Sequence, residues 1–293
     1  MYLKIRIGDC MNKDYLTRIA DAKKLINNAD FVIVGAGAGL STAGGFEYSG
    51  KTFDKYFKDF GDKYGIKDMY SGGFYPFATP EEQWAFWSRY VYVNRYLSTQ
   101  PNPIYVSLFD LVRDKDYFVV TTNVDHQFQI AGFDKTRLYY MQGDFGLFQC
   151  SVPCHNKTYD NKELILQMVQ QQKNMRIPTN LIPTCPVCGK PMTMNLRSDD
   201  NFVQDDGWYA HAKAYQDFVD KTKNKKLVLV EIGVGYNTPT IIKYPFERMT
   251  YFDKDANLIR INKDYAVCPD EIRDKTILFN EDLKDIIAHL NTD

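Results

Sequence analysis

A glycine-rich stretch directly after a short apolar run restricts the fold of this chain more than any other feature. Residues 31–34 read Phe-Val-Ile-Val, and residues 35–45 contain five glycines. Such a run is typical of a strand buried on both faces of a parallel sheet. A glycine turn after it lets backbone N–H groups approach a pyrophosphate, although glycines also serve tight packing turns. The stretch therefore predicts a nucleotide-binding α/β domain, with a purely structural turn as the alternative.

The spacing of these glycines argues against a hydride-transfer enzyme. The dehydrogenase pattern G-x-G-x-x-G fails from Gly35, where its third glycine would be Leu40, and from Gly37, where it would be Thr42. An acidic residue on a second strand, expected about twenty residues later, is also missing, because an aromatic-rich stretch begins there. We therefore expect nucleotide binding without redox chemistry.

Further apolar runs continue the alternation of helix and strand. Leu16, Ile19, Ala22 and Ile26 recur at helical spacing ahead of the first run. Other expected strands lie at residues 117–121, 137–140, 227–232, 249–252 and 276–279, and a last amphipathic helix follows with Asn280 as its N-cap. The alternation predicts an α/β fold with a Rossmann-type, doubly wound parallel sheet.

Two segments interrupt this alternation and are predicted to be insertions. Residues 46–107 are rich in aromatic side chains, with helical spacing at Trp84, Trp87 and Tyr90, whereas residues 149–206 hold paired cysteines and proline-containing turns. We expect a discontinuous sheet domain made of residues 1–45, 108–148 and 207–293. A smaller domain would join the helical insertion, residues 46–107, to a metal-binding insertion, residues 149–206.

Four of the six cysteines lie in two close pairs, which predicts a zinc site. Cys150 and Cys154 are followed by Cys185 and Cys188, the second pair in a Cys-Pro-Val-Cys-Gly turn. Two such pairs suit a tetrahedral four-thiolate Zn²⁺ site, which is closed and therefore structural. His155, next to Cys154, is a rival fourth ligand, and four unrelated thiols are the alternative.

Composition excludes several classes of partner. A net charge of -1 gives no basic surface for nucleic acid or anionic lipid, and no apolar run approaches the length that crosses a bilayer. The first nine residues also lack the apolar core of a secretion signal. We expect a cytoplasmic protein that binds neither nucleic acid nor membrane, in a compartment where cysteine pairs hold metal.

Several motifs, in order, resemble those of the sirtuins. Gly37-Ala38-Gly39-Leu40-Ser41 is similar to the sirtuin G-A-G-I-S turn, and residues 121–125, Thr-Thr-Asn-Val-Asp, to T-Q-N-I-D. Residues 233–237, Gly-Val-Gly-Tyr-Asn, resemble the G-T-S segment, and residues 261–264 resemble the segment that holds the adenosine ribose. The resemblance spans nearly the whole chain and implies NAD as co-substrate.

Departures from the family pattern indicate which reaction to expect. Gln142, followed by a glycine, stands where the deacylases have their catalytic histidine, and an amide cannot act as a general base near neutral pH. Phe-Glu-Tyr-Ser at residues 46–49 replaces P-D-F-R, and the clamp for an acyl peptide is absent from residues 196–204. The chain is similar in these respects to the macrodomain-linked class M sirtuins. That resemblance implies a protein mono-ADP-ribosyltransferase acting on a lipoyl-bearing, glycine-cleavage H-like carrier, with a macrodomain hydrolase as a candidate partner.

The expected site follows from these motifs. Asn123, Asp125 and Gln142 are the expected catalytic residues, because they would hold the nicotinamide ribose where its bond breaks. The residues expected to contact NAD are Gly37, Ala38, Gly39, Ser41, Glu47, Tyr48, Asn123, Asp125, Gln142, Gly233, Gly235, Asn237 and Asn262.

Simpler interpretations of these residues stay open. Asn123 and Asp125 also suit a turn and a helix cap, and Glu47 suits an exposed loop. His126 could replace the missing base, but a solvated histidine in a first helical turn is the commoner case. An NAD-dependent deacylase and a non-catalytic NAD-sensing zinc scaffold are the alternative functions. The acceptor side chain, its base and the oligomeric state cannot be read from the sequence.

Overall fold

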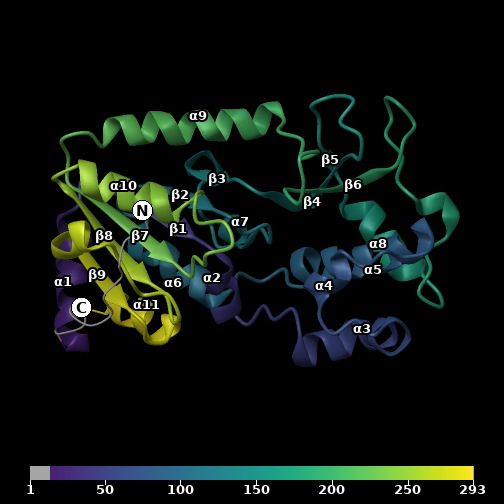
Figure 1. Ribbon diagram of the computed structural model, residues 1–293, viewed down its shortest axis with the longest axis horizontal. Coiled ribbons are helices and arrows are strands. Elements are labelled where there is room, and N and C mark those ends of the chain that lie inside the picture. Colours follow the sequence, from purple (N-terminus) through teal and green to yellow (C-terminus); the bar gives the residue numbers. More distant parts are fainter. Residues whose placement is uncertain (1–13, 293) are drawn as a thin grey trace.

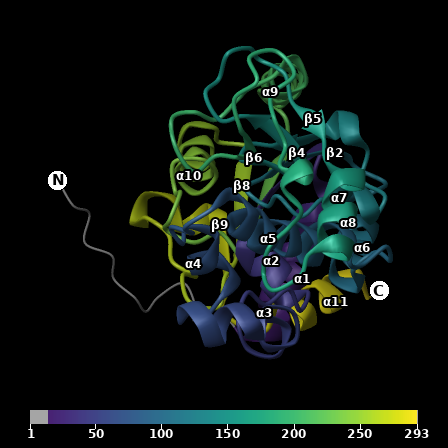
Figure 2. The same ribbon diagram turned by 90° about the vertical axis from the view of Figure 1, so that its right-hand side faces the viewer.

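The computed structural model describes residues 14–292, which build two adjoining parts (Figure 1). One part contains a parallel sheet and the other combines helices with a small antiparallel sheet. Seen from the side, the second part stands in front of the first (Figure 2). Cys10, a cysteine that belongs to neither of the two close pairs, lies outside the described residues.

The first part is centred on a six-stranded sheet with the order β3-β2-β1-β7-β8-β9, in which every neighbouring pair is parallel. Its central strand, β1, pairs with β2 on one side and β7 on the other. The strands are β1 (Phe31–Ala36), β2 (Asp116–Thr121), β3 (Leu138–Tyr140), β7 (Leu227–Ile232), β8 (Ala256–Ile261) and β9 (Thr276–Phe279). The predicted doubly wound parallel sheet is confirmed.

Helices cover both faces of this sheet, which explains why its strands are apolar throughout. Val32 and Val34 face one core and Ile33 faces the other, and all three are fully buried. The first face carries α1 (Tyr15–Asn28), α2 (Ala38–Ala43), α6 (Pro103–Val112), α7 (Gln127–Ile130) and α11 (Leu283–Asn291). The second face carries α9 (Asp206–Lys221), α10 (Lys243–Phe252) and η4 (Asp270–Lys275). A short 3-10 turn, η2 (Lys135–Arg137), leads into β3.

The second part shows that the two predicted insertions share one hydrophobic core. Phe57 and Trp84 from the first insertion pack with Phe148, Ile165 and Cys185. The helices are α3 (Gly50–Tyr64), α4 (Met69–Gly73), α5 (Pro80–Val91), the π-helix η1 (Tyr92–Tyr96), α8 (Lys162–Gln171) and the 3-10 helix η3 (Thr179–Leu181). The antiparallel sheet has the order β5-β4-β6, with β4 (Gly143–Cys150), β5 (Tyr159–Asp160) and β6 (Met192–Leu196).

These contacts bear on where the two parts meet along the chain. Helix α6 begins at Pro103 yet packs Ile104 and Tyr105 into the core of the parallel sheet. Strand β4 begins at Gly143 and packs in the core of the second part. We therefore propose limits near residues 102 and 142 rather than 107 and 148. The division into domains stays a prediction.

Two sequence expectations about elements are wrong. Residues 249–252 form the last turn of α10, not a strand, because Phe246 and Thr250 are buried at helical spacing while Phe252 is 76% exposed. The strand lies just beyond, in β8. The N-cap of α11 is Asp282, whose carboxylate accepts a hydrogen bond from Lys284 N at 2.8 Å, and not Asn280. Among the described helices, none combines the length and apolarity needed to span a bilayer.

Candidate active site and metal centre

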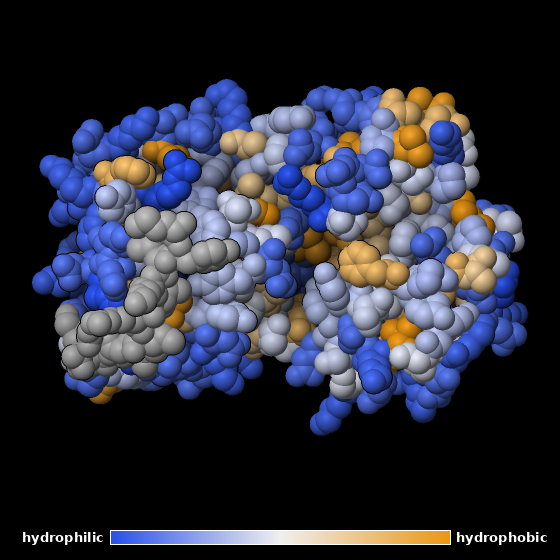
Figure 3. Space-filling view, in the orientation of Figure 1, coloured by the Kyte–Doolittle hydropathy of each residue, from blue (hydrophilic) through white to orange (hydrophobic). Residues whose placement is uncertain are grey.

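Most of the predicted site residues lie in the segments that come after the carboxyl ends of five parallel strands. Gly37 follows β1, Asn123 follows β2, Gln142 follows β3, Gly233 follows β7 and Asn262 follows β8. Because the strands are parallel, these ends meet at one edge of the sheet, where ligands of such folds bind. A hollow separates the two parts of the molecule (Figure 3).

Two glycine turns pack backbone against backbone at this edge. Gly37 N and Gly39 N each donate a 3.0 Å hydrogen bond, to Ile232 O and Gly233 O respectively. A Cβ atom on Gly39 would lie 2.7 Å from Gly233 Cα, and Gly233 itself has a φ of +61°. Two of the amides expected to face a pyrophosphate are therefore engaged within the protein. Ala38, the first residue of α2, is exposed at the same edge.

A buried polar cluster joins the loops that follow β1 and β2. Asp125 Oδ2 accepts a 2.5 Å hydrogen bond from Ser41 Oγ, which also bonds the Tyr105 hydroxyl at 2.8 Å. Asn123 Nδ2 donates to both hydroxyl groups at 3.1 Å. The second carboxylate oxygen of Asp125 accepts from Gln127 N at 3.1 Å. Ser41, Asn123 and Asp125, predicted separately from two motifs, thus form one network.

Burial sets the electrostatics of this cluster. Desolvation raises the pKa of Asp125, and the hydrogen bonds from Ser41 and Gln127 N oppose the shift. Desolvation, reinforced by the charge of Asp125, also raises the pKa of Tyr105 far above its ordinary value. Tyr105 is therefore a neutral hydroxyl, and among residues 14–292 the hydrogen-bond partners of the Asp125 carboxyl group are Ser41, Tyr105 and Gln127 N, none of them a cation.

The loops after β7 and β8 form the other half of the edge. Asn262 is buried, and its Nδ2 donates to Val234 O at 2.8 Å while its Oδ1 accepts from the amides of Asp264 and Tyr265. The Asn262 side chain thus shapes the turn that a ribose would contact. Gly235 and Asn237 lie exposed on the loop after β7.

The remaining predicted residues lie at the border between the two parts. Tyr48 precedes α3, and its ring contacts that of Tyr90 edge-on at 5.9 Å. Desolvation, followed by the charge of Asp125, raises the pKa of Tyr48 to about 12, which puts its hydroxyl within electrostatic reach of the polar cluster. Glu47 is exposed on the same loop. Gln142 is half-buried, and its backbone oxygen accepts a 3.0 Å hydrogen bond from Arg197 N.

His126 is not the solvated histidine of a first helical turn that the sequence favoured. It is the N-cap of α7 in a left-handed conformation, with a φ of +67°. Its Nδ1 lies 2.7 Å from Asp144 Oδ2, and Arg95 Nε donates to the other carboxylate oxygen at 3.0 Å. Asp144 is buried, but the hydrogen bond with His126 and the charge of Arg95 outweigh desolvation and lower its pKa.

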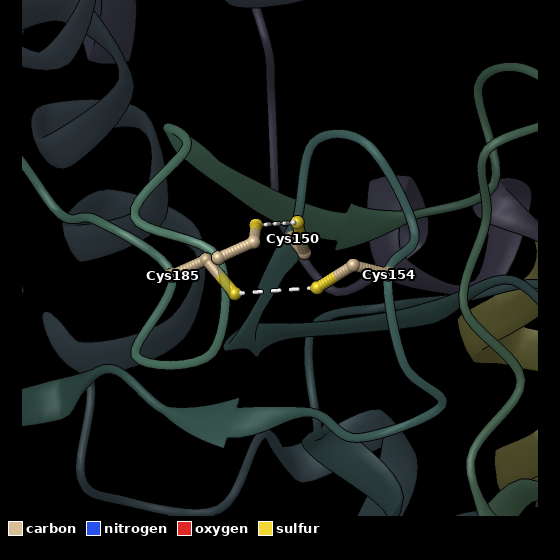
Figure 4. A group of neighbouring side chains, drawn as sticks. Cys150, Cys154 and Cys185 are labelled. Carbon is tan, nitrogen blue, oxygen red and sulfur yellow. Dashed lines mark hydrogen bonds between the residues drawn. The ribbon is translucent and has the colours of Figure 1, made fainter.

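The four predicted zinc ligands converge on one point (Figure 4). Their sulfur atoms all lie within 4.8 Å of one another, with Cys150 Sγ 3.6 Å from Cys188 Sγ and Cys154 Sγ 3.7 Å from Cys185 Sγ. Thiolates about 2.3 Å from a tetrahedral Zn²⁺ are separated by about 3.8 Å. The four cysteines therefore fit a closed zinc site with no position for a substrate.

The neighbours of the cysteines shift the pKa values of Cys185 and Cys154 in opposite directions. Desolvation opposes ionisation of Cys185, but the backbone amides of Cys188 and Val187 prevail and lower its pKa to about 7. Desolvation and the neighbouring thiols raise the pKa of Cys154 to about 12. His155 Nδ1 lies 3.0 Å from Cys154 Sγ and its Nε2 lies 2.8 Å from the Tyr159 hydroxyl. His155 thus contacts a ligand sulfur instead of replacing one.

Sequence reasoning missed two groups at this site. Tyr105 lies in an apolar helix, and no motif distinguishes it from a core aromatic residue. Arg95 and Asp144 are far apart in sequence, and only the position of Asp144, two residues after Gln142, could have drawn attention to it.

Comparison with known proteins decides the family. A Staphylococcus aureus (strain Mu50) protein named protein ADP-ribosyltransferase is 38% identical over 264 residues, which cover 90% of this chain and 84% of that protein. The chain belongs to the sirtuin-like protein ADP-ribosyltransferases. These enzymes are NAD-dependent transferases, as predicted. No family model matches the sequence.

Other relatives of this ADP-ribosyltransferase agree in fold. A Fusarium oxysporum f. sp. cubense protein named probable bifunctional ADP-ribose hydrolase/ADP-ribosyltransferase is 30% identical over 252 residues, and the chain spans 41% of its length. A Sir2 structure with a p53 peptide and NAD⁺ is similar over 92% of this chain and 95% of that chain, with 20% identity and a TM-score of 0.56. A Sir2Tm structure with a propionylated peptide has the same coverage, 19% identity and a TM-score of 0.56. These structures support the predicted Rossmann-type sirtuin fold.

Proposed function

We propose that this enzyme transfers a single ADP-ribose from NAD to a carrier protein that bears a lipoyl group, similar to the H protein of glycine cleavage. One observation carries the proposal. A complete Ser41–Asn123–Asp125 network follows β1 and β2, and an amide, Gln142, follows the next strand, β3, where a deacylase needs a base. The site is thus equipped to break the bond to nicotinamide but not to activate a ribose hydroxyl for deacylation.

The residues of the network suggest how the bond breaks. Departure of nicotinamide leaves positive charge on the ribose carbon, which a nearby carboxylate stabilises. We assign this role to Asp125, with Ser41 and Gln127 N fixing its orientation. Asn123, held by the hydroxyls of Ser41 and Tyr105, would orient the nicotinamide ribose. Gln142 would hydrogen-bond a ribose hydroxyl without removing its proton.

The remaining predicted residues would contact the pyrophosphate, the adenosine and the nicotinamide end of NAD. Ala38 at the start of α2 would face the pyrophosphate, with Gly37, Gly39 and Gly233 allowing the close approach. Gly235, Asn237 and Asn262 would surround the adenosine, and Glu47 and Tyr48 would close the nicotinamide end. A structural zinc on the four cysteines holds the second part together.

The acceptor and partner are inferred from the class M resemblance. A protein acceptor follows from the family, and residues 196–204 lack the clamp for an acyl peptide that deacylases use. The Fusarium relative, named as both hydrolase and transferase, supports a macrodomain hydrolase that removes the modification. Clustered thiols suited to zinc favour the reducing cytoplasm as its compartment.

A direct competition tests the proposal against its alternatives. The enzyme and NAD are given a lipoylated carrier, its unlipoylated form and an acetylated lysine peptide, and products are followed by mass spectrometry. We expect the lipoylated carrier alone to gain one ADP-ribose. Gln142→His should not restore deacetylation, because no clamp positions the acyl oxygen. Rapid loss of the acetyl group without carrier modification would establish a deacylase, and NAD binding without nicotinamide release would establish a sensor.

A further inference from the structure

A histidine on the same loop as Asn123 and Asp125 is paired with a buried aspartate at the start of β4. His126 directly follows Asp125, and its Nδ1 is hydrogen-bonded to Asp144 Oδ2 at 2.7 Å. Asp144 is held in turn by Arg95 Nε at 3.0 Å and by the Gly146 amide at 2.6 Å. The pair thus joins the loop after β2 to η1 and the start of β4.

The partners of Asp144 fix the protonation of the imidazole. The carboxylate can only accept hydrogen bonds, so His126 Nδ1 carries the proton and Nε2 is left as the acceptor in the neutral ring. Nε2 has no hydrogen-bond partner within residues 14–292, and the His126 side chain is 26% exposed. An imidazole oriented in this way can receive a proton, as Gln142 cannot.

The backbone of His126 is also in a costly conformation. A φ of +67° is uncommon for a residue with a Cβ, and such strain persists where the surrounding structure requires it. Glycine or asparagine would fit this conformation more readily. The position therefore holds a histidine at the expense of stability.

We propose that His126 is the general base that deprotonates the acceptor during ADP-ribosyl transfer, with Asp144 and Arg95 as its positioning residues. The inference rests on the proposed transfer reaction, but not on the identity of the carrier. His126, at the end of the neighbouring strand, would supply the general base that Gln142 cannot provide.

The proton and the electron pair balance in this step. The bond from the ribose carbon to the nicotinamide nitrogen breaks, and its electron pair leaves with neutral nicotinamide. The acceptor heteroatom forms the new bond to the same carbon, and its proton moves to His126 Nε2. Asp144 stabilises the resulting imidazolium, which later releases the proton to water.

Several charged or titratable groups surround the pair and bear on its pH response. Asp144 contacts the ring, and Arg95 and the Gly146 amide stand behind that carboxylate. Within electrostatic reach of Asp144 are Asp125, Tyr96 and Tyr140. The lowered pKa of Asp144 keeps it ionised across the neutral range, so its carboxylate remains available to accept the Nδ1 proton of His126.

The experiment exploits the backbone of His126. His126→Asn keeps an amide that can bond Asp144 and suits the left-handed conformation, whereas His126→Gly leaves room for added imidazole. His289→Gln on α11 is the matched control, because His289 bonds Tyr15 away from the active-site edge. Transfer to the lipoylated carrier and hydrolysis of NAD by water are measured from acidic to basic pH, with NAD affinity and melting temperature.

We expect wild-type activity to rise with pH through the neutral range. His126→Asn should lose about 10²-fold or more of the rate and lose that rise, while its NAD affinity and melting temperature are kept. Imidazole should restore part of the rate of His126→Gly alone, and His289→Gln should match wild type.

Two results would count against His126 as the base, and a third would count only against the proposed carrier. An unchanged rate and pH profile in His126→Asn would exclude His126 as the base. Loss of NAD binding together with activity, without rescue by imidazole, would make it a structural residue. If wild type hydrolyses NAD but does not modify the carrier, only the carrier proposal fails, because the same variants then test His126 with water as acceptor.

Discussion

The buried carboxylate of Asp125 has a cost that stability measurements should reveal. Its folded-state pKa lies above the unfolded value of 3.8, mainly because of desolvation. Folding therefore opposes its ionisation: the penalty is absent below the unfolded pKa, grows as pH rises from that value to the folded pKa, and is complete above the folded pKa. Removing the charge should relieve the penalty.

We therefore expect Asp125→Asn to melt at a higher temperature than wild type at neutral pH while losing transfer. The difference should shrink as pH falls through the unfolded pKa of 3.8, below which the carboxyl is protonated in both states. Thermal melts of both proteins at several pH values test this. A variant that is less stable at neutral pH would show that the hydrogen bonds from Ser41 and Gln127 N outweigh desolvation.

Asn123 should separate chemistry from binding. Within the described residues, its side chain hydrogen-bonds Ser41 and Tyr105 at the proposed nicotinamide end, whereas the proposed adenosine half of the site lies on other strands. Asn123→Ala should lower the transfer rate by about 10²-fold or more. Titration calorimetry should show that most of the NAD affinity remains. Thr122→Ala on the same loop is the control, and undiminished turnover would reject the role of Asn123.

At the scale of single elements, β7 and β8 are joined by a fully buried ion cluster. Glu231 contacts Lys243 Nζ and Arg260 at 2.7 Å each, and all three side chains have 0% exposure. Glu231→Gln would leave the buried Lys243 without its ion-pair partner and Arg260 with Glu247 alone, which costs about 3–5 kcal/mol. Chemical denaturation measures this loss. Asp217→Asn, which breaks an exposed pair on α9, should change stability by less than about 1 kcal/mol, and equal effects would contradict the argument.

The elements illustrate what periodicity can and cannot predict. Strands β1, β2, β7 and β9 were predicted because an apolar run bounded by turns has few other interpretations. Residues 249–252 were wrongly predicted as a strand because a short aromatic run suits the end of a helix equally well. Strand β8 was not predicted because it contains Asn257 and Arg260. The charge of Arg260 is tolerated in a buried strand because Glu231 and Glu247 both pair with it, contacts that no local pattern reveals.

The same distinction applies to the site. Residues within motifs, such as Ser41, Asn123 and Asp125, were predictable because turns after parallel strands must meet at one edge. Tyr105 lies on α6, which packs on the parallel sheet, whereas the Arg95–Asp144 pair belongs to the second part, and the positions of all three depend on how these elements pack. Sequence spacing holds no information about such packing.

At the scale of the whole molecule, the metal centre supports more than its own loop. Cys150 and Cys185 lie in the same core as Trp84, Phe86 and Phe148. Loss of the metal should therefore loosen both insertions and, through η1 and β4, the border of the active site.

Cys185→Ala should lose the one zinc expected per chain and several kcal/mol of stability. Metal analysis and thermal melting test this, and a chelator should reproduce the effect in wild type. Val187→Ala, in the same turn but 64% exposed, is the control. A variant without zinc that keeps the wild-type melt and activity would make the cluster dispensable.

The strand order also has a consequence for synthesis on the ribosome. β1 is made early, yet one of its two neighbours, β7, begins only at Leu227. Every residue in the core of the second part emerges before then, the last being Met194 and Leu196. The zinc-bearing part can thus be complete while the nascent β1 still exposes an unpaired apolar edge. Limited proteolysis of ribosome-bound chains whose emerged part ends near residue 206 should cut at β1 and spare the cysteine cluster.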